Sequence, residues 1–157
     1  MEFLQGDLIG NILAVLGAVF AFIITGIGSA RAVGAGGQAG AGVLTEDQDK
    51  FVPVMILQAL PSTQNIYGFV IAFLIIGKII IGEPLDFGAG LTLFLASLPV
   101  GIVGYVSAVL QGRVSVAGIH MVAKQAEGMI KGVVLALMVE MFAILSLIIS
   151  ILIIGKA

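Results

Sequence analysis

The sequence predicts an all-α membrane protein in which four transmembrane helices form two duplicated helical hairpins that assemble into a homo-oligomeric ring. Composition is the first reason: of the 157 residues, 60% are hydrophobic and only 10% are charged, whereas about a quarter of a soluble domain is charged. Long apolar stretches and a likeness between the two halves of the chain are the other reasons. The net charge of −2 offers no basic surface, so a nucleic acid is not an expected partner.

Four apolar stretches are long enough to cross a lipid bilayer, which takes about 20 helical residues. They are residues 8–27 with a glycine-rich extension to 43, residues 51–81, residues 91–110 with an extension through 111, and residues 133–154. The fourth stretch contains a single charge, Glu140.

Short connections at residues 45–50, 82–88 and 124–131 join these stretches. Most basic residues lie on the side of the first and third connections: Arg31, Lys50, Arg113, Lys124 and Lys131. Only Lys78 and Lys156 lie opposite. Because cytoplasmic connections carry the excess of Lys and Arg, we expect a multi-pass plasma-membrane protein with connections 45–50 and 124–131 in the cytoplasm and both termini outside.

The halves 1–82 and 83–157 resemble each other, with short motifs in the same order and Ser62 opposite Glu140. Both halves have the same topology, so we interpret them as parallel repeats of one hairpin within one membrane domain, of which the second carries the carboxylate. The first helix is rich in glycine, at positions Gly26, Gly28, Gly34, Gly36, Gly37, Gly40 and Gly42. Small residues mark close helix packing in lipid, either within one chain or in a tight inner ring of identical subunits.

Other polar residues are expected at the depth of Glu140. An ionised carboxylate in mid-bilayer is costly, so it is paired, neutralised or functional. Glu140 lies about 14 Å along its helix from Lys131, Thr63 and Gln64 lie about 20 Å beyond Lys50, and Gln111 lies about 20 Å from Lys124. A protonated Glu140 that only bonds a neighbouring helix is the plainer alternative.

These groups are one carboxylate and several neutral oxygens, which hard cations prefer as ligands. Pro61 cannot donate a backbone N–H and disturbs the helix, so it can free backbone oxygens, including that of Leu60. Tyr67 lies one turn after Thr63 on the same face, where it either donates to Glu140 or is an ordinary buried tyrosine. No phosphate-binding loop is present, so the chain is not expected to bind ATP or to be an enzyme on its own.

In four motifs the sequence resembles the rotor-ring proteolipids (K or c subunits) of bacterial V-type ATPases that translocate Na⁺. The motifs are Leu60-Pro61-Ser62-Thr63-Gln64, Tyr67-Gly68, Gln111-Gly112-Arg113 and Val139-Glu140. The resemblance implies a ring of identical subunits in the lipid bilayer that turns against a membrane stator subunit and is driven through central-stalk subunits by ATP hydrolysis elsewhere in the complex.

The resemblance also implies the ion site. Side-chain oxygens of Thr63, Gln64, Gln111 and Glu140 and the backbone oxygen of Leu60 would bind Na⁺, and Tyr67 would lock the site. Ser62 stands where close relatives usually carry glycine, which removes no ligand. Since Ser62 is also the first-hairpin counterpart of Glu140, one ion per chain is expected.

Two alternatives remain. A proton-translocating proteolipid (H⁺ in place of Na⁺) needs only a carboxyl group that desolvation keeps protonated, which would leave the three neutral side chains without a purpose. A small multidrug exporter also has four helices and one membrane glutamate. It would need a broad aromatic pocket, yet we expect only Tyr67 and Phe142 near Glu140.

Overall fold

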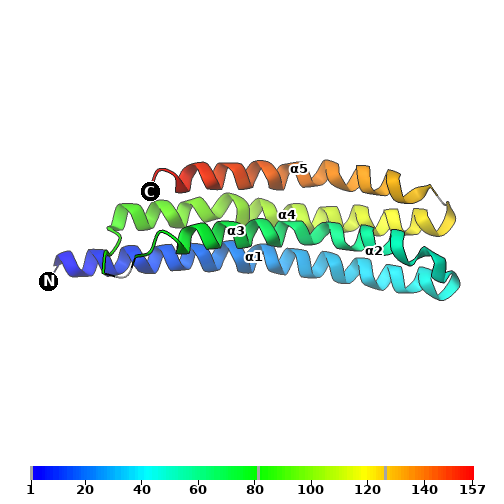
Figure 1. The fold of residues 1–157 in the computed structure, drawn as a ribbon, viewed down its shortest axis with the longest axis horizontal. Helices are drawn as coiled ribbons and strands as arrows, with labels where there is room; N and C mark the ends of the chain where they lie inside the picture. The colour runs from blue at the N-terminus through cyan, green and yellow to red at the C-terminus, as the bar shows by residue number, and fades with distance from the viewer. Residues whose placement is uncertain (1, 81, 126) are drawn as a thin grey trace.

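The computed structural model describes residues 2–80, 82–125 and 127–157, with side chains from residue 8 onward (Figure 1). Its helices are α1 (Glu2–Glu46), the 3₁₀ turn η1 (Gln48–Lys50), α2 (Phe51–Ala59), the 3₁₀ turn η2 (Leu60–Ser62), α3 (Thr63–Ile76), α4 (Phe87–Lys124) and α5 (Gly128–Ile154). Since α2, η2 and α3 follow one another without a break, they form a single rod.

The predicted four spans are confirmed. Within the described ranges, four helical stretches are long and apolar enough to cross a membrane, namely Leu8–Glu46, Gln48–Ile76, Phe87–Lys124 and Gly128–Ile154. They run side by side in an elongated bundle, with both termini near one end and the α1–α2 and α4–α5 connections at the other (Figure 1). The most extensive packing joins α1 to α4 and α4 to α5.

Small residues allow α1 and α4 to approach closely. A Cβ atom on Gly90 would overlap the backbone of Gly10, and one on Gly28 would lie 3.0 Å from the backbone of Tyr105. Gly34 and Gly42, by contrast, have no described residue beyond their own stretch of α1 within 4 Å of such an atom. The α1 glycines therefore divide into those that pack within the chain and those that face open space.

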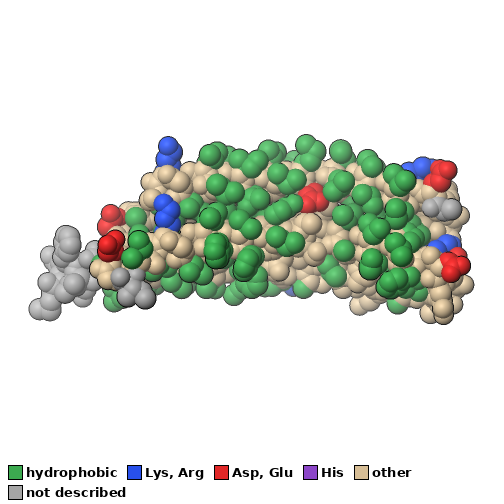
Figure 2. Space-filling model, in the orientation of Figure 1, with side chains coloured by type: hydrophobic (Ala, Val, Ile, Leu, Met, Phe, Trp, Pro, Cys, Tyr) green, Lys and Arg blue, Asp and Glu red, His purple; other side chains and the backbone are tan. Residues whose placement is uncertain are grey.

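The outer surface is apolar over most of its length. Large hydrophobic side chains such as Phe142 (65% exposed) and Phe73 (66% exposed) point outward. On the face seen in Figure 2, charged side chains gather at the two ends, apart from an acidic group midway along. This is the surface expected of a bundle whose solvent is lipid.

The second span ends earlier than predicted. Its helix stops at Ile76, with Gly77 as the C-cap, whereas the apolar pattern predicted a helix to residue 81, which itself lies outside the described residues. Glycine is a poor helix former, and after it the N–H groups of Lys78 and Ile79 bond to carbonyls only three residues back. Ile79 still packs against the core, so the pattern predicted its burial correctly and its helical state wrongly.

The other helices are longer than the apolar stretches. Helix α4 begins at Phe87, where the Asp86 side chain accepts the Ala89 N–H at 2.8 Å, as N-cap residues do. It ends at Lys124, and α5 begins at Gly128. The α4–α5 connection, between Lys124 and Gly128, is therefore shorter than the predicted 124–131. The α3–α4 connection, between Ile76 and Phe87, is longer than the predicted 82–88, because α3 ends early.

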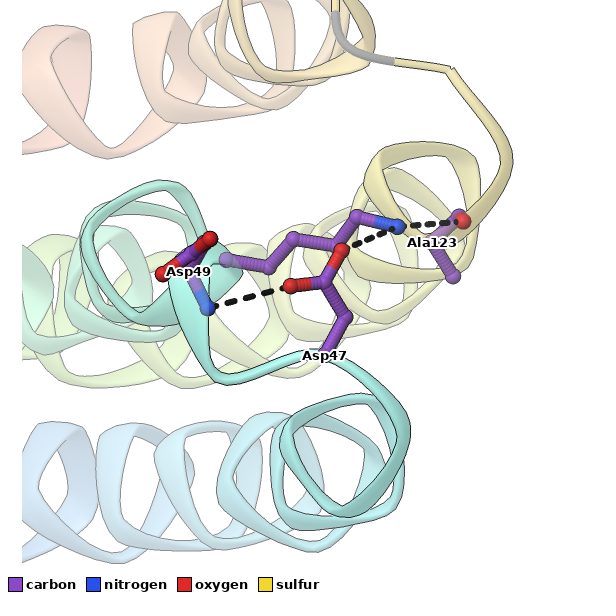
Figure 3. A network of polar contacts seen from close by, with 4 residues as sticks. Asp47, Asp49 and Ala123 are labelled. Atoms are coloured by element: carbon purple, nitrogen blue, oxygen red, sulfur yellow. Dashed lines mark hydrogen bonds and ion pairs between the residues drawn. The ribbon is translucent and has the colours of Figure 1, made fainter.

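Polar contacts join the two hairpins at the end of the bundle opposite the termini (Figure 3). The Lys50 ammonium donates to the Ala123 carbonyl at 2.7 Å and lies 3.3 Å from the Asp47 carboxylate. Asp47 also accepts the Asp49 N–H at 3.1 Å. Lys50 thus satisfies a carbonyl in the last turn of α4 and ties the first connection to the second hairpin.

Candidate functional site

Glu140 lies in the interior of α5, far from both ends of that helix. Only 5% of its surface is exposed. Among the side chains that the structure describes, ion pairs form only between Lys50 and Asp47 and between Lys131 and Glu127. Glu140 is therefore buried without a basic partner from this part of the chain, and its contacts are neutral.

Two neutral side chains from other helices contact the Glu140 carboxyl group. The Tyr67 hydroxyl of α3 donates to Oε1 at 2.5 Å. The Gln111 amide of α4 donates to Oε2 at 3.3 Å and to the Ala136 carbonyl of α5 at 3.1 Å. Each carboxyl oxygen thus has its own donor, and three helices meet at this group.

Gln64 extends the cluster from α3. Its Nε2 donates to Gln111 Oε1 at 2.6 Å, and both glutamines are fully buried. A buried amide must find partners for its donors and acceptor. The Gln64–Gln111 hydrogen bond meets that need for one hydrogen of Gln64 and for the oxygen of Gln111.

The 3₁₀ turn η2 places the remaining predicted oxygens beside Gln64. Pro61 has no N–H to donate to the Leu57 carbonyl, and the rod tightens to 3₁₀ geometry over Leu60–Ser62. The Leu60 carbonyl accepts the Thr63 backbone N–H and, at 3.0 Å, its hydroxyl. The Thr63 hydroxyl also lies 3.4 Å from Gln64 Oε1.

The structure thus brings all the predicted site residues into one continuous set of hydrogen bonds: Leu60, Thr63, Gln64, Tyr67, Gln111 and Glu140. At η2, the Thr63 hydroxyl oxygen lies 3.0 Å from the Leu60 carbonyl oxygen and 3.4 Å from Gln64 Oε1. A carboxylate with neutral oxygens around it is a donor set that suits a hard cation such as Na⁺.

The sequence did not predict the participation of Ser107. This buried side chain of α4 donates to the Val139 carbonyl at 3.0 Å and accepts from Gln64 Nε2 at 3.4 Å. Its spacing offered a signal, because Ser107 lies one helical turn before Gln111 and so shares its face. Serine is common in membrane helices as a packing residue, so the spacing alone did not single out Ser107.

Other singled-out residues lie outside this set. The Ser62 hydroxyl donates to the Ala59 carbonyl of its own helix at 2.6 Å. Arg31 is exposed and donates to the Tyr105 hydroxyl at 2.7 Å. It lines a groove of about 470 Å³ between α1 and α4 together with Arg113.

The chain matches the family model that describes the C subunit of ATP synthase over residues 16–75 and 87–153. It is 44% identical over 157 residues to the V-type sodium ATPase subunit K of Enterococcus hirae, which covers 100% of this chain and 99% of that one. It is 38% identical over 141 residues to the A-type ATP synthase subunit K of Methanocaldococcus jannaschii, covering 90% of this chain and 61% of that relative.

The family match covers both halves of the chain and includes every residue of the hydrogen-bonded set around Glu140. The full-length identity with the enterococcal protein extends the likeness to the helix ends and connections as well. The resemblance seen in the four short motifs is thereby confirmed, and the chain belongs to the family of ATP synthase C subunits.

Proposed function

We propose that this chain is the rotor-ring subunit of a V-type ATPase, which binds Na⁺ and carries it across the membrane as a ring of identical copies rotates against a stator. The full-length likeness to a V-type sodium ATPase subunit K supports this function. ATP hydrolysis takes place on other subunits of the complex and reaches the ring through a central stalk. The family assignment argues against the small multidrug exporter.

One observation carries the proposal for the ion. Glu140 is buried at mid-helix among neutral oxygen-bearing side chains and not beside a basic residue in the described part of the chain. In the proposed site, Na⁺ is bound by side-chain oxygens of Thr63, Gln64, Gln111 and Glu140 and by the Leu60 carbonyl. A proton would need only the carboxyl group, whereas two buried glutamines and a 3₁₀ turn that presents a carbonyl suit a metal cation.

Neutralisation of charge explains how such a site turns within lipid. A bare carboxylate facing hydrocarbon is strongly disfavoured, but bound Na⁺ cancels its charge and replaces the missing basic partner. At the stator, a cation and an aqueous half-channel would favour release of the ion, because water then solvates both charges. Rotation in one direction thereby carries ions across the membrane, and a large ion gradient can drive the reverse.

The arrangement of the chain in the membrane follows from the same proposal. The two hairpins, 1–82 and 83–157, are copies of one unit, of which only the second carries a carboxylate in the middle of a membrane helix, so each chain carries one ion. Connections 45–50 and 124–131 face the cytoplasm, where the stalk docks, and the termini face outside the plasma membrane. Apart from Arg31, Arg113 and Glu140, the charged residues lie toward the ends of the helices. The length between the ends carries large exposed hydrophobic side chains, which would meet lipid.

Carbodiimide modification of the assembled ring tests the choice of ion. Dicyclohexylcarbodiimide reacts with a protonated carboxyl group in an apolar site, so we expect labelling at Glu140 and none in Glu140→Gln. At one fixed pH, added Na⁺ is expected to slow the labelling, whereas the same concentration of a bulky cation such as choline is not.

The controls distinguish Na⁺ transport from H⁺ transport. Labelling that responds to pH but not to Na⁺ would support the proton-translocating alternative and contradict Na⁺ transport. Choline also fixes ionic strength, so any protection by Na⁺ reflects binding and not screening of charge.

A further inference from the structure

The two hydrogens of the Gln64 amide group determine which way its oxygen points. One goes to Gln111 Oε1 at 2.6 Å and the other to Ser107 Oγ at 3.4 Å. The amide has no third hydrogen, so Oε1 is left on the side of Thr63, whose hydroxyl lies 3.4 Å away. The orientation of this one amide therefore decides whether an oxygen or an NH₂ group faces the η2 turn.

The Ser107 hydroxyl can only accept from Gln64. Its single hydrogen is donated to the Val139 carbonyl of α5 at 3.0 Å, so its oxygen presents lone pairs to α3. If the Gln64 amide were rotated by half a turn, its oxygen would face the Ser107 oxygen without a hydrogen between them. Burial of both side chains makes such an unpaired contact unfavourable.

We propose that Ser107 is a positioning residue for ion binding, which holds the Gln64 amide so that its oxygen faces the cation. This inference rests on the proposed Na⁺ site but adds a residue that is not a ligand. Ser107 acts through Gln64, and its hydrogen bond to the carbonyl that precedes Glu140 fixes α4 against α5 at the same level.

Gln111 supports the same orientation from the other side. Both of its amide hydrogens are used, on the Ala136 carbonyl and on Glu140 Oε2, so its Oε1 also accepts from Gln64. Ser107 and Gln111 together leave one direction for the Gln64 oxygen. Without Ser107, one amide hydrogen of Gln64 loses its partner and the rotated amide becomes more populated.

The test compares Na⁺ affinity of assembled rings that carry Ser107→Ala, measured as the Na⁺ concentration that halves carbodiimide labelling of Glu140. We expect affinity to fall about two- to tenfold, the effect of losing one ordinary hydrogen bond. Ser107→Thr keeps the hydroxyl and should restore affinity. Ser97→Ala is the matched control, because Ser97 is buried in the same helix and donates only to the Phe94 carbonyl at 2.6 Å.

A double-mutant cycle separates positioning from packing. If Ser107 acts through Gln64, Ser107→Ala should weaken Na⁺ binding in the normal chain but have no further effect in Gln64→Ala. An equal loss of affinity in both backgrounds would overturn the proposal, since Ser107 would then act through the Val139 carbonyl. Unchanged affinity of Ser107→Ala in the normal chain would also overturn it.

Two further measurements separate the positioning role from a packing defect and from the proposed Na⁺ function. Ser107→Cys keeps a γ atom at this position, a somewhat larger sulfur that is a poor acceptor, and should match Ser107→Ala. A loss of affinity with Ala alone would indicate a packing defect and contradict the proposal. Protection of the unaltered chain by Na⁺ is measured in the same series. Its absence would refute the proposed Na⁺ function itself, whereas normal protection with a silent Ser107 would refute only the positioning role.

Discussion

Glu140 is surrounded by groups that stabilise it in different ways at its two oxygens. Tyr67 donates to Oε1 from α3, and Gln111 donates to Oε2 from α4. These donors orient the group but carry no charge, so the negative charge itself must be cancelled by something that binds. The contacts thus favour a site that is complete only when a cation or a proton is present.

Replacement of Tyr67 by phenylalanine tests whether the hydroxyl locks the site. The change removes the 2.5 Å hydrogen bond to Glu140 and keeps the aromatic ring of residue 67 in place. Because a hydrogen bond to a charged group is worth more than a neutral one, we expect Na⁺ exchange to become faster and affinity to fall by about tenfold or more. The measurement is exchange of ²²Na⁺ from loaded, purified rings.

Tyr105→Phe is the control for this prediction. Tyr105 is the other tyrosine of the chain, and its hydroxyl accepts from Arg31 and not from the site. The Tyr105→Phe variant should exchange Na⁺ at the normal rate. Normal exchange in Tyr67→Phe as well would show that the tyrosine is an ordinary buried residue.

Substitution of Gln111 by alanine removes a proposed ligand and two hydrogen-bond partners. Glu140 Oε2 loses its amide donor and Gln64 Nε2 loses its acceptor. We expect Na⁺ affinity to fall by about 100-fold, since loss of an outer partner alone costs 10- to 100-fold in metal sites. Gln58→Ala provides the comparison, because the hydrogen bond that the described residues give Gln58 goes to the Val33 carbonyl, at 3.4 Å, and not to the site. Equal affinity in the two variants would remove Gln111 from the site.

The depth of the site residues in the membrane could be predicted from the sequence. The direction in which each side chain points around its helix axis could be predicted only in part. Helical rise alone put Gln64, Gln111 and Glu140 in one layer, and the structure places them in contact. Ser107 was missed because its role depends on where its hydrogen goes, which is decided by a carbonyl on another helix. Hydrogen-bond direction of this kind is a property of the packed bundle.

At the scale of the helix, the glycines of α1 have more than one role. Most of those singled out in the sequence face other residues of the same chain: Gly26, Gly28, Gly36, Gly37 and Gly40. Gly34 and Gly42 face open space. Packing within one chain thus accounts for much of the pattern, and the two open positions are where contact with another copy remains to be expected.

Two glycine-to-alanine changes are predicted to affect thermal stability differently. Alanine favours an isolated helix over glycine by about 0.8–1 kcal/mol, so Gly34→Ala should leave the thermal stability of the dissociated chain equal or higher. At Gly90 the added Cβ atom would overlap the Gly10 backbone, which forces α1 and α4 apart and should lower stability. Thermal unfolding in detergent measures both variants.

The stability of the assembled ring tests whether Gly34 contacts a neighbouring copy. If Gly34→Ala folds normally but its rings fall apart at a lower temperature than the normal rings, Gly34 lies at a contact between copies. A variant with intact rings would place Gly34 on a free surface. A Gly90→Ala chain as stable as the normal one would contradict the close approach of α1 and α4.

Helix boundaries were the least predictable elements because local chemistry overrides the apolar pattern. Pro61 predicted a disturbed helix, and the structure shows a 3₁₀ turn at Leu60–Ser62. Gly77 ended the same rod before Ile79 and Ile80, which lie outside the helix although they belong to the apolar run. An apolar run therefore predicts burial in lipid or core, and the cap residues determine where the helix stops.

For the whole molecule, the two hairpins are joined at both ends. Lys50 bonds the Ala123 carbonyl at the end opposite the termini, and Lys78 bonds the Ala157 carbonyl at 3.0 Å near the C-terminus. Between these ends the described helices pack along their lengths. A chain braced in this way can move as one body, as the proposed rotation of the ring requires.

The orientation of that body is open to direct measurement because the chain has no cysteine. Single substitutions Gln48→Cys and Lys156→Cys place a thiol at opposite ends of the bundle, and both native side chains are exposed. The excess of Lys and Arg near connections 45–50 and 124–131 predicts that these face the cytoplasm. In intact cells, a membrane-impermeant maleimide should therefore label Lys156→Cys and spare Gln48→Cys. Permeabilised cells should label both, and the reverse pattern in intact cells would show that the charge distribution misleads in this chain.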